Sequence, residues 1–253
     1  MKLFYKGLVI SKKQKAGRGR NGKICVRRRQ GRISSLYRKV NFNLSFKQKD
    51  NYKLVRIEYD PNRSAFIGLL YNFKDSSFNY ILLPKGLSLN EIILNSSEES
   101  FKKKPGFRTF LYNFPLGSII HNISLSLLGN GIFARSSGSF AKILQKNIRN
   151  KYVRIRLSSG EERLLHQGCK ATLGIVSDKK KKIKKKKAGW SRLMGKRPSV
   201  RGVAMNPVDH PHGGGEGRTS GGRCSVSPWG KLTIGQKTVS KKNYMVTHSR
   251  KQT

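Results

Sequence analysis

Apolar and polar residues alternate along the middle of the chain in a way that is typical of β-strands. Val55, Ile57 and Tyr59 are apolar, and charged residues separate them. This period of two predicts a strand whose buried face carries these three side chains. Apolar runs over 65–73 and 78–83 predict two further strands.

Turn residues divide these strands into two sets. A hairpin loop is expected at 72–77, and the segment 84–86 closes the first set. The second set begins near Pro115 and includes strands over 152–157 and 162–166. Within the second set, alternate positions are expected on one buried face: Ile119, His121, Ile123, Leu125 and Leu127. At His121 this pattern favours a core or interface histidine over an RNA contact.

Many short strands, frequent turns and no long helical period predict an all-β protein. The two sets are each long enough for one small barrel, so we expect two barrels in series. The expected domains are a basic N-terminal extension at 1–39, barrels at 40–114 and 115–178, and a basic C-terminal extension at 179–253.

The net charge of the chain indicates what kind of partner it binds. The 253 residues include 54 Lys or Arg and 12 Asp or Glu, a formal net charge of +42. Residues 1–39 hold 14 of the bases and no acid, and residues 179–253 hold 20 bases and 2 acids. Such an excess needs a polyanionic partner, for which nucleic acid is the strongest candidate. Neither extension has enough apolar residues to fold alone.

Several other classes of protein are disfavoured. The apolar runs are too short to span a bilayer, so we expect no membrane partner. The first residues do not resemble a secretory signal. Cys25, Cys169 and Cys224 are odd in number and far apart, which argues against a disulfide framework and favours a reducing compartment.

The N-terminal extension alternates glycine with basic residues over 17–23. Glycine allows the backbone to approach a phosphate closely, and arginine offers a planar set of donors. A solvated tail or a targeting peptide is the alternative, although the glycines oppose the amphipathic helix of a mitochondrial presequence. The lysine run at 179–187 predicts phosphate contact without sequence choice, with a nuclear-import signal or a solvated linker as alternatives.

The most distinctive segment is 202–218, which is rich in glycine and contains Asp209, His210 and His212. Four interpretations compete for it: a metal site, general acid–base chemistry, a phosphate cradle at 213–215, and an irregular loop that becomes rigid on RNA. The flanking positive charge favours the loop on RNA.

Motifs along most of the chain resemble those of the universal large-subunit ribosomal protein L2 family. The C-terminal motifs are Gly195-Lys196-Arg197-Pro198-Ser199-Val200-Arg201, the segment 202–218, and Ser227-Pro228-Trp229-Gly230. The barrel motifs include Tyr59-Asp60-Pro61-Asn62-Arg63-Ser64-Ala65 and Ala134-Arg135-Ser136-Ser137-Gly138. The resemblance covers roughly residues 17–240, with the motifs in family order.

This resemblance implies an OB-like barrel followed by an SH3-like barrel, with both extensions in ribosomal RNA. It implies other ribosomal proteins and the small subunit as partners, and roles in subunit assembly and in support of the peptidyl transferase centre, near which His210 would lie. It implies no catalytic residue and no cofactor, with Mg²⁺ only through bound RNA. The residues expected to bind RNA are Arg18, Arg20, Arg27, Arg28, Arg29, Arg32, Arg38, Arg63, Arg135, Trp190, Arg192, Lys196, Arg197, Arg201, Asn206, His210, His212, Gly213, Gly214, Gly215, Arg218 and Trp229.

The chain also departs from the family pattern. Arg27-Arg28-Arg29-Gln30-Gly31-Arg32 stands where a glycine–histidine stretch is usual, and the lysine run replaces a more mixed connector. Frequent Lys, Asn, Ile, Phe and Ser indicate an AT-rich coding genome, so we expect a protein made inside a mitochondrion, with plastid and bacterial origins as alternatives. Two other functions stay open: a DNA- or RNA-compacting basic protein, and a metal-dependent hydrolase built on Asp209, His210 and His212.

Overall fold

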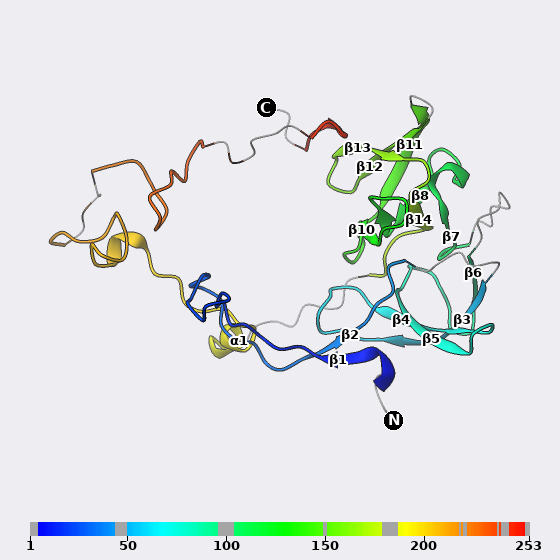
Figure 1. The fold of residues 1–253 in the computed structure, drawn as a ribbon, viewed down its shortest axis with the longest axis horizontal. Helices are drawn as coiled ribbons and strands as arrows, with labels where there is room; N and C mark the ends of the chain where they lie inside the picture. Colours follow the sequence, from blue (N-terminus) through cyan, green and yellow to red (C-terminus); the bar gives the residue numbers. More distant parts are fainter. Residues whose placement is uncertain are drawn as a thin grey trace. The chain divides into compact units, whose positions relative to one another are not determined.

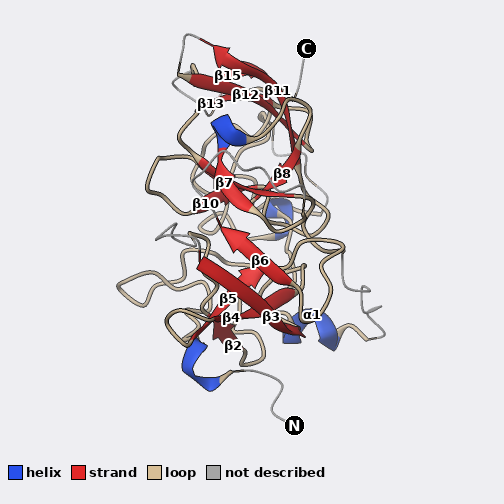
Figure 2. Ribbon diagram, turned by 90° about the vertical axis from the view of Figure 1, so that its right-hand side faces the viewer, coloured by secondary structure: helices blue, strands red, loops and turns tan. Residues whose placement is uncertain are grey.

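The computed structural model is nearly all β, which confirms the predicted fold class (Figures 1 and 2). Contacts group the chain into two units. Unit 1 comprises 1–12, 35–183 and 244–253, and unit 2 comprises 13–34 and 184–243. The structure describes residues 5–43, 50–95, 104–148, 151–178, 187–217, 219, 222–236, 238 and 243–250.

The first group of strands in unit 1 forms the sheet order β6-β3-β4-β5. These strands are β3 (Asp50–Glu58), β4 (Ile67–Asn72), β5 (Ser77–Leu82) and β6 (Ile92–Asn95). β4 and β5 pair in full antiparallel register around the predicted hairpin loop, which is thereby confirmed. Leu54, Leu70 and Ile81 are buried together in the core of this group.

The predicted buried face of β3 is wrong. Val55, Ile57 and Tyr59 are exposed, whereas Leu54 and the carboxylate of Glu58 are buried. The register between β3 and β4 shifts between Leu54 and Arg56, which is the signature of a β-bulge. The inward face nevertheless stays on the even-numbered positions along the whole strand, from Tyr52 and Leu54 to Glu58, which accepts a hydrogen bond from the Tyr80 hydroxyl. The apolar side chains at 55, 57 and 59 therefore lie on the outward face.

The second group of strands follows, in the order β13-β12-β11-β8-β14-β7. Its core includes Ile143, Val153 and Ile155, which confirms the alternation predicted over 152–157. A parallel pair, Asn95 with Arg108, joins β6 to β7, so the two groups share one continuous sheet. The strands are β7 (Arg108–Phe110), β8 (Ile119–His121), β9 (Ile123–Ser124), β10 (Gly131–Phe133), β11 (Ala141–Ile148), β12 (Tyr152–Leu157), β13 (Glu162–His166) and β14 (Lys170–Leu173).

The single buried face expected between 119 and 127 is not found. His121 and Ile123 are buried, and His121 is thus confirmed as a core residue, but Ile119, Leu125 and Leu127 are exposed. Asn122 has a φ of 50°, which ends β8, and β9 then pairs separately with β10. A left-handed residue breaks the strand, so the alternation does not continue through it.

Both ends of unit 1 pair with its strands. β1 (Val9–Ser11) pairs with β2 (Leu36–Arg38), and β15 (Val246–His248) pairs with β13. Parts of both predicted extensions therefore belong to unit 1. The 3₁₀ helices are η1 (Lys6–Leu8), η2 (Leu111–Asn113) and η3 (Gly202–Ala204).

Unit 2 joins the two basic extensions by backbone hydrogen bonds. Ile33 N–H donates to the carbonyl of Leu193, at the end of helix α1 (Gly189–Leu193), over 3.0 Å, and Arg197 N–H donates to the carbonyl of Arg28 over 3.1 Å. Each of the three hydrophobic clusters found among the described residues lies in unit 1. No helix among the described residues is long and apolar enough to cross a membrane.

The buried hydroxyl of Tyr80 supplies a first prediction. It donates to Glu58 Oε2 over 2.7 Å and accepts the N–H of Tyr5 over 2.9 Å, and burial together with the bond to Glu58 raises the Tyr80 pKa to about 12. We expect Tyr80→Phe to lower the free energy of unfolding by about 2 kcal/mol, because a bond to a buried carboxylate is lost. Urea unfolding of the full-length chain measures this change. Tyr71→Phe is the control, and equal effects of the two substitutions would contradict the assignment.

The buried imidazole of His121 supplies a second prediction. Burial lowers the His121 pKa to about 4, and its Nδ1 lies 2.9 Å from the carbonyl of Gly174. In the unfolded chain His121 has its ordinary pKa near 6.5 and binds a proton that it excludes in the folded chain. The free energy of unfolding therefore falls as the pH drops from about 6.5 towards 4. Between pH 7 and pH 5 the loss is about 2 kcal/mol. Unfolding curves at these two pH values should differ less for His121→Gln, and an unchanged pH dependence would refute the role of His121.

Candidate nucleic-acid interface

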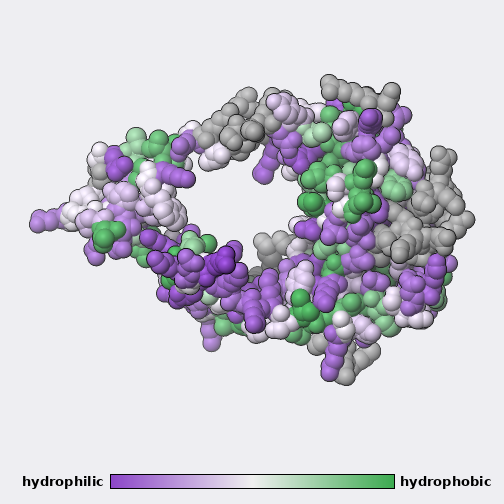
Figure 3. All heavy atoms as spheres, viewed as in Figure 1, coloured by the Kyte–Doolittle hydropathy of each residue, from purple (hydrophilic) through white to green (hydrophobic). Residues whose placement is uncertain are grey.

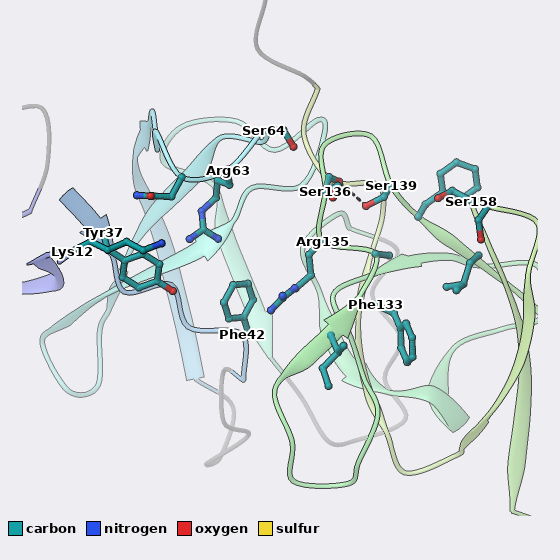
Figure 4. A pocket seen from close by; sticks show the side chains of 16 residues that line it. Lys12, Tyr37, Phe42, Arg63, Ser64, Phe133, Arg135, Ser136, Ser139 and Ser158 are labelled. Atoms are coloured by element: carbon teal, nitrogen blue, oxygen red, sulfur yellow. Dashed lines mark hydrogen bonds between the residues drawn. The ribbon is translucent and has the colours of Figure 1, made fainter. Parts of the chain in front are cut away.

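Two arginines from separate barrel motifs meet over one aromatic ring in unit 1 (Figure 4). The guanidinium of Arg135 lies 4.5 Å from the centroid of Phe42, and that of Arg63 lies 5.7 Å from it. Figure 4 shows the two side chains pointing towards Phe42 from different segments. We call this cavity of about 740 Å³ the Arg63–Arg135 pocket.

Local hydrogen bonds explain how Arg63 is held. Asp60 is fully buried, and its carboxylate pairs with Arg63 Nε and accepts the N–H of Asn62 over 2.8 Å. The amide of Asn62 donates in turn to the carbonyl of Leu36 over 2.8 Å. Pro61 restricts the backbone between the acid and its two partners. The motif therefore forms a rigid turn that fixes one guanidinium.

Arg135 is positioned by a second turn. Ala134 has a φ of 52°, and Arg135 Nη1 donates to the carbonyl of Gly131 over 3.2 Å. The N–H of Ser137 donates to Ser64 Oγ over 3.2 Å, which ties this turn to the motif that carries Arg63. Positions 63 and 135 are 72 residues apart in the sequence, and the fold brings them together.

The lining of the pocket suits a nucleic acid. Lys12 adds a third cation to the two arginines, and the described residues that line the pocket include no acidic side chain. Aromatic rings and guanidinium planes can stack on bases, and serine hydroxyls can bond to sugars or phosphates. Phe42, Tyr37 and Lys12 were not among the predicted residues, because their contribution depends on segments that meet only in the folded chain.

The basic residues of unit 2 form a largely exposed set. Gly17 has a φ of 78°, and a Cβ added there would lie 2.6 Å from the carbonyl oxygen of Val26, so this turn requires glycine. Trp229 is 72% exposed, which suits a stacking platform, whereas Trp190 is half-buried. The predicted residues that are exposed here are Arg18, Arg20, Arg27, Arg28, Arg29, Arg32, Arg192, Lys196, Arg197, Arg201, Asn206 and Gly215.

Arg38 and Arg218 are not part of this exposed set. Arg38 is only 6% exposed on β2, so its guanidinium has little surface to offer to RNA, in contrast to its predicted role. Arg218 lies outside the described residues, as do positions 179–186 of the lysine run.

The histidines of the C-terminal segment are engaged within the protein. His210 is only 8% exposed, and its Nδ1 accepts the N–H of His212 over 3.0 Å. His212 Nε2 accepts the N–H of Val226 over 3.1 Å, and the two rings meet edge to face at 5.1 Å. The imidazole of His210 packs on Gly202, where an added Cβ would lie 2.5 Å from the ring.

These contacts describe how the segment packs on itself. One nitrogen of each ring is occupied by a backbone N–H, and the described residues contain no group of three or more His, Cys, Asp or Glu side chains that could hold a metal. Gly213 and Gly214 are half-buried, and a Cβ at Gly213 would lie 2.3 Å from the carbonyl oxygen of Asn206. The segment is therefore a self-packed loop, which we call the histidine loop (201–214).

Comparisons with known proteins agree with these features. Residues 5–95 match the family model described as "Ribosomal Proteins L2, RNA binding N-terminal domain", and residues 104–230 match "Ribosomal Proteins L2, C-terminal domain". Three curated relatives share the name large ribosomal subunit protein uL2. That of Azorhizobium caulinodans is 45% identical over 98% of this chain and 92% of its own length.

The other two relatives are similarly close. The protein of Methylorubrum extorquens is 47% identical over 94% of this chain and 84% of its own length. The protein of the Wolbachia strain from Brugia malayi is 42% identical over 94% of this chain and 85% of its own length. The family resemblance seen in the sequence motifs is thus confirmed, and the chain belongs to the ribosomal protein L2 (uL2) family.

Proposed function

We propose that the chain is a structural constituent of the large ribosomal subunit that binds large-subunit ribosomal RNA. The observation that carries this proposal is the Arg63–Arg135 pocket, in which cations and an aromatic ring converge without an acidic lining side chain among the described residues. The names of the relatives and the RNA-binding family model support it.

The mechanism is charge neutralisation combined with shape. Each Lys or Arg that meets a phosphate releases condensed counterions, so the exposed basic residues of unit 2 supply affinity with little sequence choice. The pocket adds selectivity, because a stacked guanidinium and several hydroxyls fit an unstacked base and its 2′-hydroxyl. Unit 2 lacks a hydrophobic cluster among its described residues, so RNA is what orders it.

The finer roles in this proposal are supported by the family resemblance. The chain supports assembly of the subunit, contacts other ribosomal proteins, and reaches the small subunit across the interface. The histidine loop lies near the peptidyl transferase centre, where the RNA performs the chemistry, so the chain contributes no catalytic residue and needs no cofactor beyond Mg²⁺ held by RNA. The ribosome in question is that of a mitochondrion, an assignment that the frequent Lys, Asn, Ile, Phe and Ser support.

Removing one pocket cation tests the RNA interface. We expect Arg135→Gln to weaken binding to large-subunit RNA about tenfold and to reduce the salt slope by about one, because a phosphate or base contact is lost. Filter binding at several salt concentrations, with co-sedimentation on the large subunit, measures both effects. Arg156→Gln removes an equal charge that is already paired with Glu162 over 2.7 Å, so it should change binding little. Equal losses of RNA affinity for Arg135→Gln and Arg156→Gln would contradict the proposal. An affinity for duplex DNA equal to that for large-subunit RNA would contradict it too.

The histidine loop has its own test. His210→Ala removes the ring that packs on Gly202, and Gly202→Ala places a methyl group against that ring. Both substitutions should slow peptide-bond formation on purified ribosomes while large subunits still assemble, because each displaces the loop alone. Val208→Ala, at a 91% exposed position, is the control. Equal losses of assembly and of translation would count against a position near the active centre.

A further inference from the structure

The Arg63–Arg135 pocket adjoins a segment that carries no charge of its own. Residues 119–134 contain no Lys, Arg, Asp or Glu, and Figure 3 shows hydrophobic atoms gathered over the second strand group of unit 1. Uncharged side chains release no counterions from RNA, so this segment adds no affinity by charge. The segment ends directly before Arg135, so what it can add besides packing is the placement of that guanidinium.

Asn122 makes the contacts that join this segment to the pocket. Its side-chain amide donates to the carbonyl of Phe42 over 3.4 Å, and its backbone N–H donates to the carbonyl of Ala134 over 3.1 Å. Phe42 carries the aromatic ring of the pocket, and Ala134 directly precedes the arginine that lies over this ring. One residue therefore binds the backbone on both sides of the cation–π pair.

Gly131 provides a third link between Asn122 and the pocket. Its N–H donates to the carbonyl of Phe42 over 3.2 Å, and its carbonyl accepts Arg135 Nη1 over 3.2 Å. A Cβ added at Gly131 would lie 1.9 Å from Asn122 Oδ1, so the asparagine side chain packs directly on this glycine. All three links therefore act on the 4.5 Å separation between the Arg135 guanidinium and the Phe42 ring.

Asn122 is itself held by a buried cation. Arg108 is 1% exposed, and its Nη1 donates to the carbonyl of Asn122 over 3.0 Å and to Thr172 Oγ1 over 3.1 Å. Burial lowers the Arg108 pKa to about 10, so the guanidinium stays charged at neutral pH. Its Nε and Nη2 have no hydrogen-bond partner among the described residues. Burying such a group is unfavourable, and the carbonyl of Asn122 is one of the two acceptors that offset this cost.

The backbone of Asn122 separates its conformation from the role of its side chain. Asn122 has a φ of 50° and is 7% exposed. Glycine adopts this left-handed conformation more readily than asparagine does, so the conformation alone requires no side chain. The bond to Phe42 is what the amide of Asn122 adds.

We propose that Asn122 is a positioning residue of the Arg63–Arg135 pocket, which holds the Phe42 ring and the Arg135 guanidinium in place for an unstacked RNA base. A ring and a guanidinium at a fixed separation offer a base a preformed surface, whereas two groups that move independently must first be ordered by the ligand. This inference rests on the proposed function, because it concerns how the same pocket binds RNA.

A double-mutant cycle between Asn122 and Arg135 tests this role. Asn122→Gly tolerates the left-handed backbone, keeps its N–H and removes the amide. We expect it to weaken the binding of the full-length chain to large-subunit RNA about fivefold. It should have little further effect when Arg135→Gln is present, because the guanidinium that Asn122 positions is then gone. Filter binding of the native chain, the two single variants and the double variant measures this coupling.

Asn90→Gly is the matched control. Asn90 is also left-handed, with a φ of 65°, but it is exposed and does not line the pocket. The same substitution there should leave the affinity for RNA unchanged.

The salt dependence of binding gives an independent measurement. Asn122→Gly removes no charge, yet it should reduce the salt slope towards that of Arg135→Gln, because the displaced cation no longer meets its phosphate. A partly unfolded variant instead loses affinity in proportion to its folded fraction, which urea unfolding at the same salt concentrations measures.

Asn122→Asp decides the question if the glycine variant does not fold. Aspartate keeps the volume of the side chain and tolerates the left-handed backbone, but an ionised carboxylate cannot donate to the carbonyl of Phe42. Asn90→Asp adds the same charge outside the pocket and is the control. We expect the loss of RNA affinity to exceed that of the control about fivefold and to disappear in the presence of Arg135→Gln.

The other outcomes overturn the proposal. Losses that multiply in the double variant, a salt slope that Asn122→Gly leaves unchanged, or equal effects of the changes at 122 and 90 would each exclude a positioning role for Asn122. In these cases the loss caused by Arg135→Gln alone would leave the proposed RNA pocket standing. If Arg135→Gln alone does not weaken RNA binding, the proposed pocket fails, and the role of Asn122 fails with it.

Discussion

Repulsion among positive charges is the constraint on which the rest of this structure depends. The acids are too few to neutralise 54 lysines and arginines, and the structure places the ion pairs found among its described residues in unit 1. There they serve position more than stability: Asp60 orients Arg63, and Glu162 holds Arg156. Unit 2 has only Asp209 and Glu216 among its own acids and no hydrophobic cluster in its described part. Unit 2 is therefore the part of the chain whose charge is least compensated from within, which is why we propose an anionic partner for it.

The sequence predicts structure well where local pattern and tertiary packing agree. Val153 and Ile155 alternate with polar residues and are buried, and β4 and β5 pair around the expected loop. It fails where a single residue interrupts the pattern. Glu58 takes an inward position of β3 through its bond to Tyr80, which leaves Val55 and Ile57 outside, and the left-handed Asn122 ends β8. Neither effect leaves a signal in hydrophobic periodicity.

The same distinction explains which site residues could be predicted. Arg63 and Arg135 lie in motifs, so each is visible in the sequence by itself. Phe42 has no motif, and its place between them arises because the folded chain brings three distant segments together. Arg38 shows what charge alone does not reveal, since a basic residue within the predicted N-terminal extension is buried on a strand. Charge predicts the partner, and packing decides which cations face it.

The histidine loop is ordered by its own contacts, although no hydrophobic cluster is found around it among the described residues. Its histidine nitrogens accept backbone N–H groups of its own unit, and its glycines are required by close backbone contacts, so its local shape is set by the protein. The described residues around it form no hydrophobic cluster that could hold it in place. A loop that is already formed can bind at one position without paying the entropy of folding there. This preformed shape is what the proposed contact with a fixed RNA surface requires.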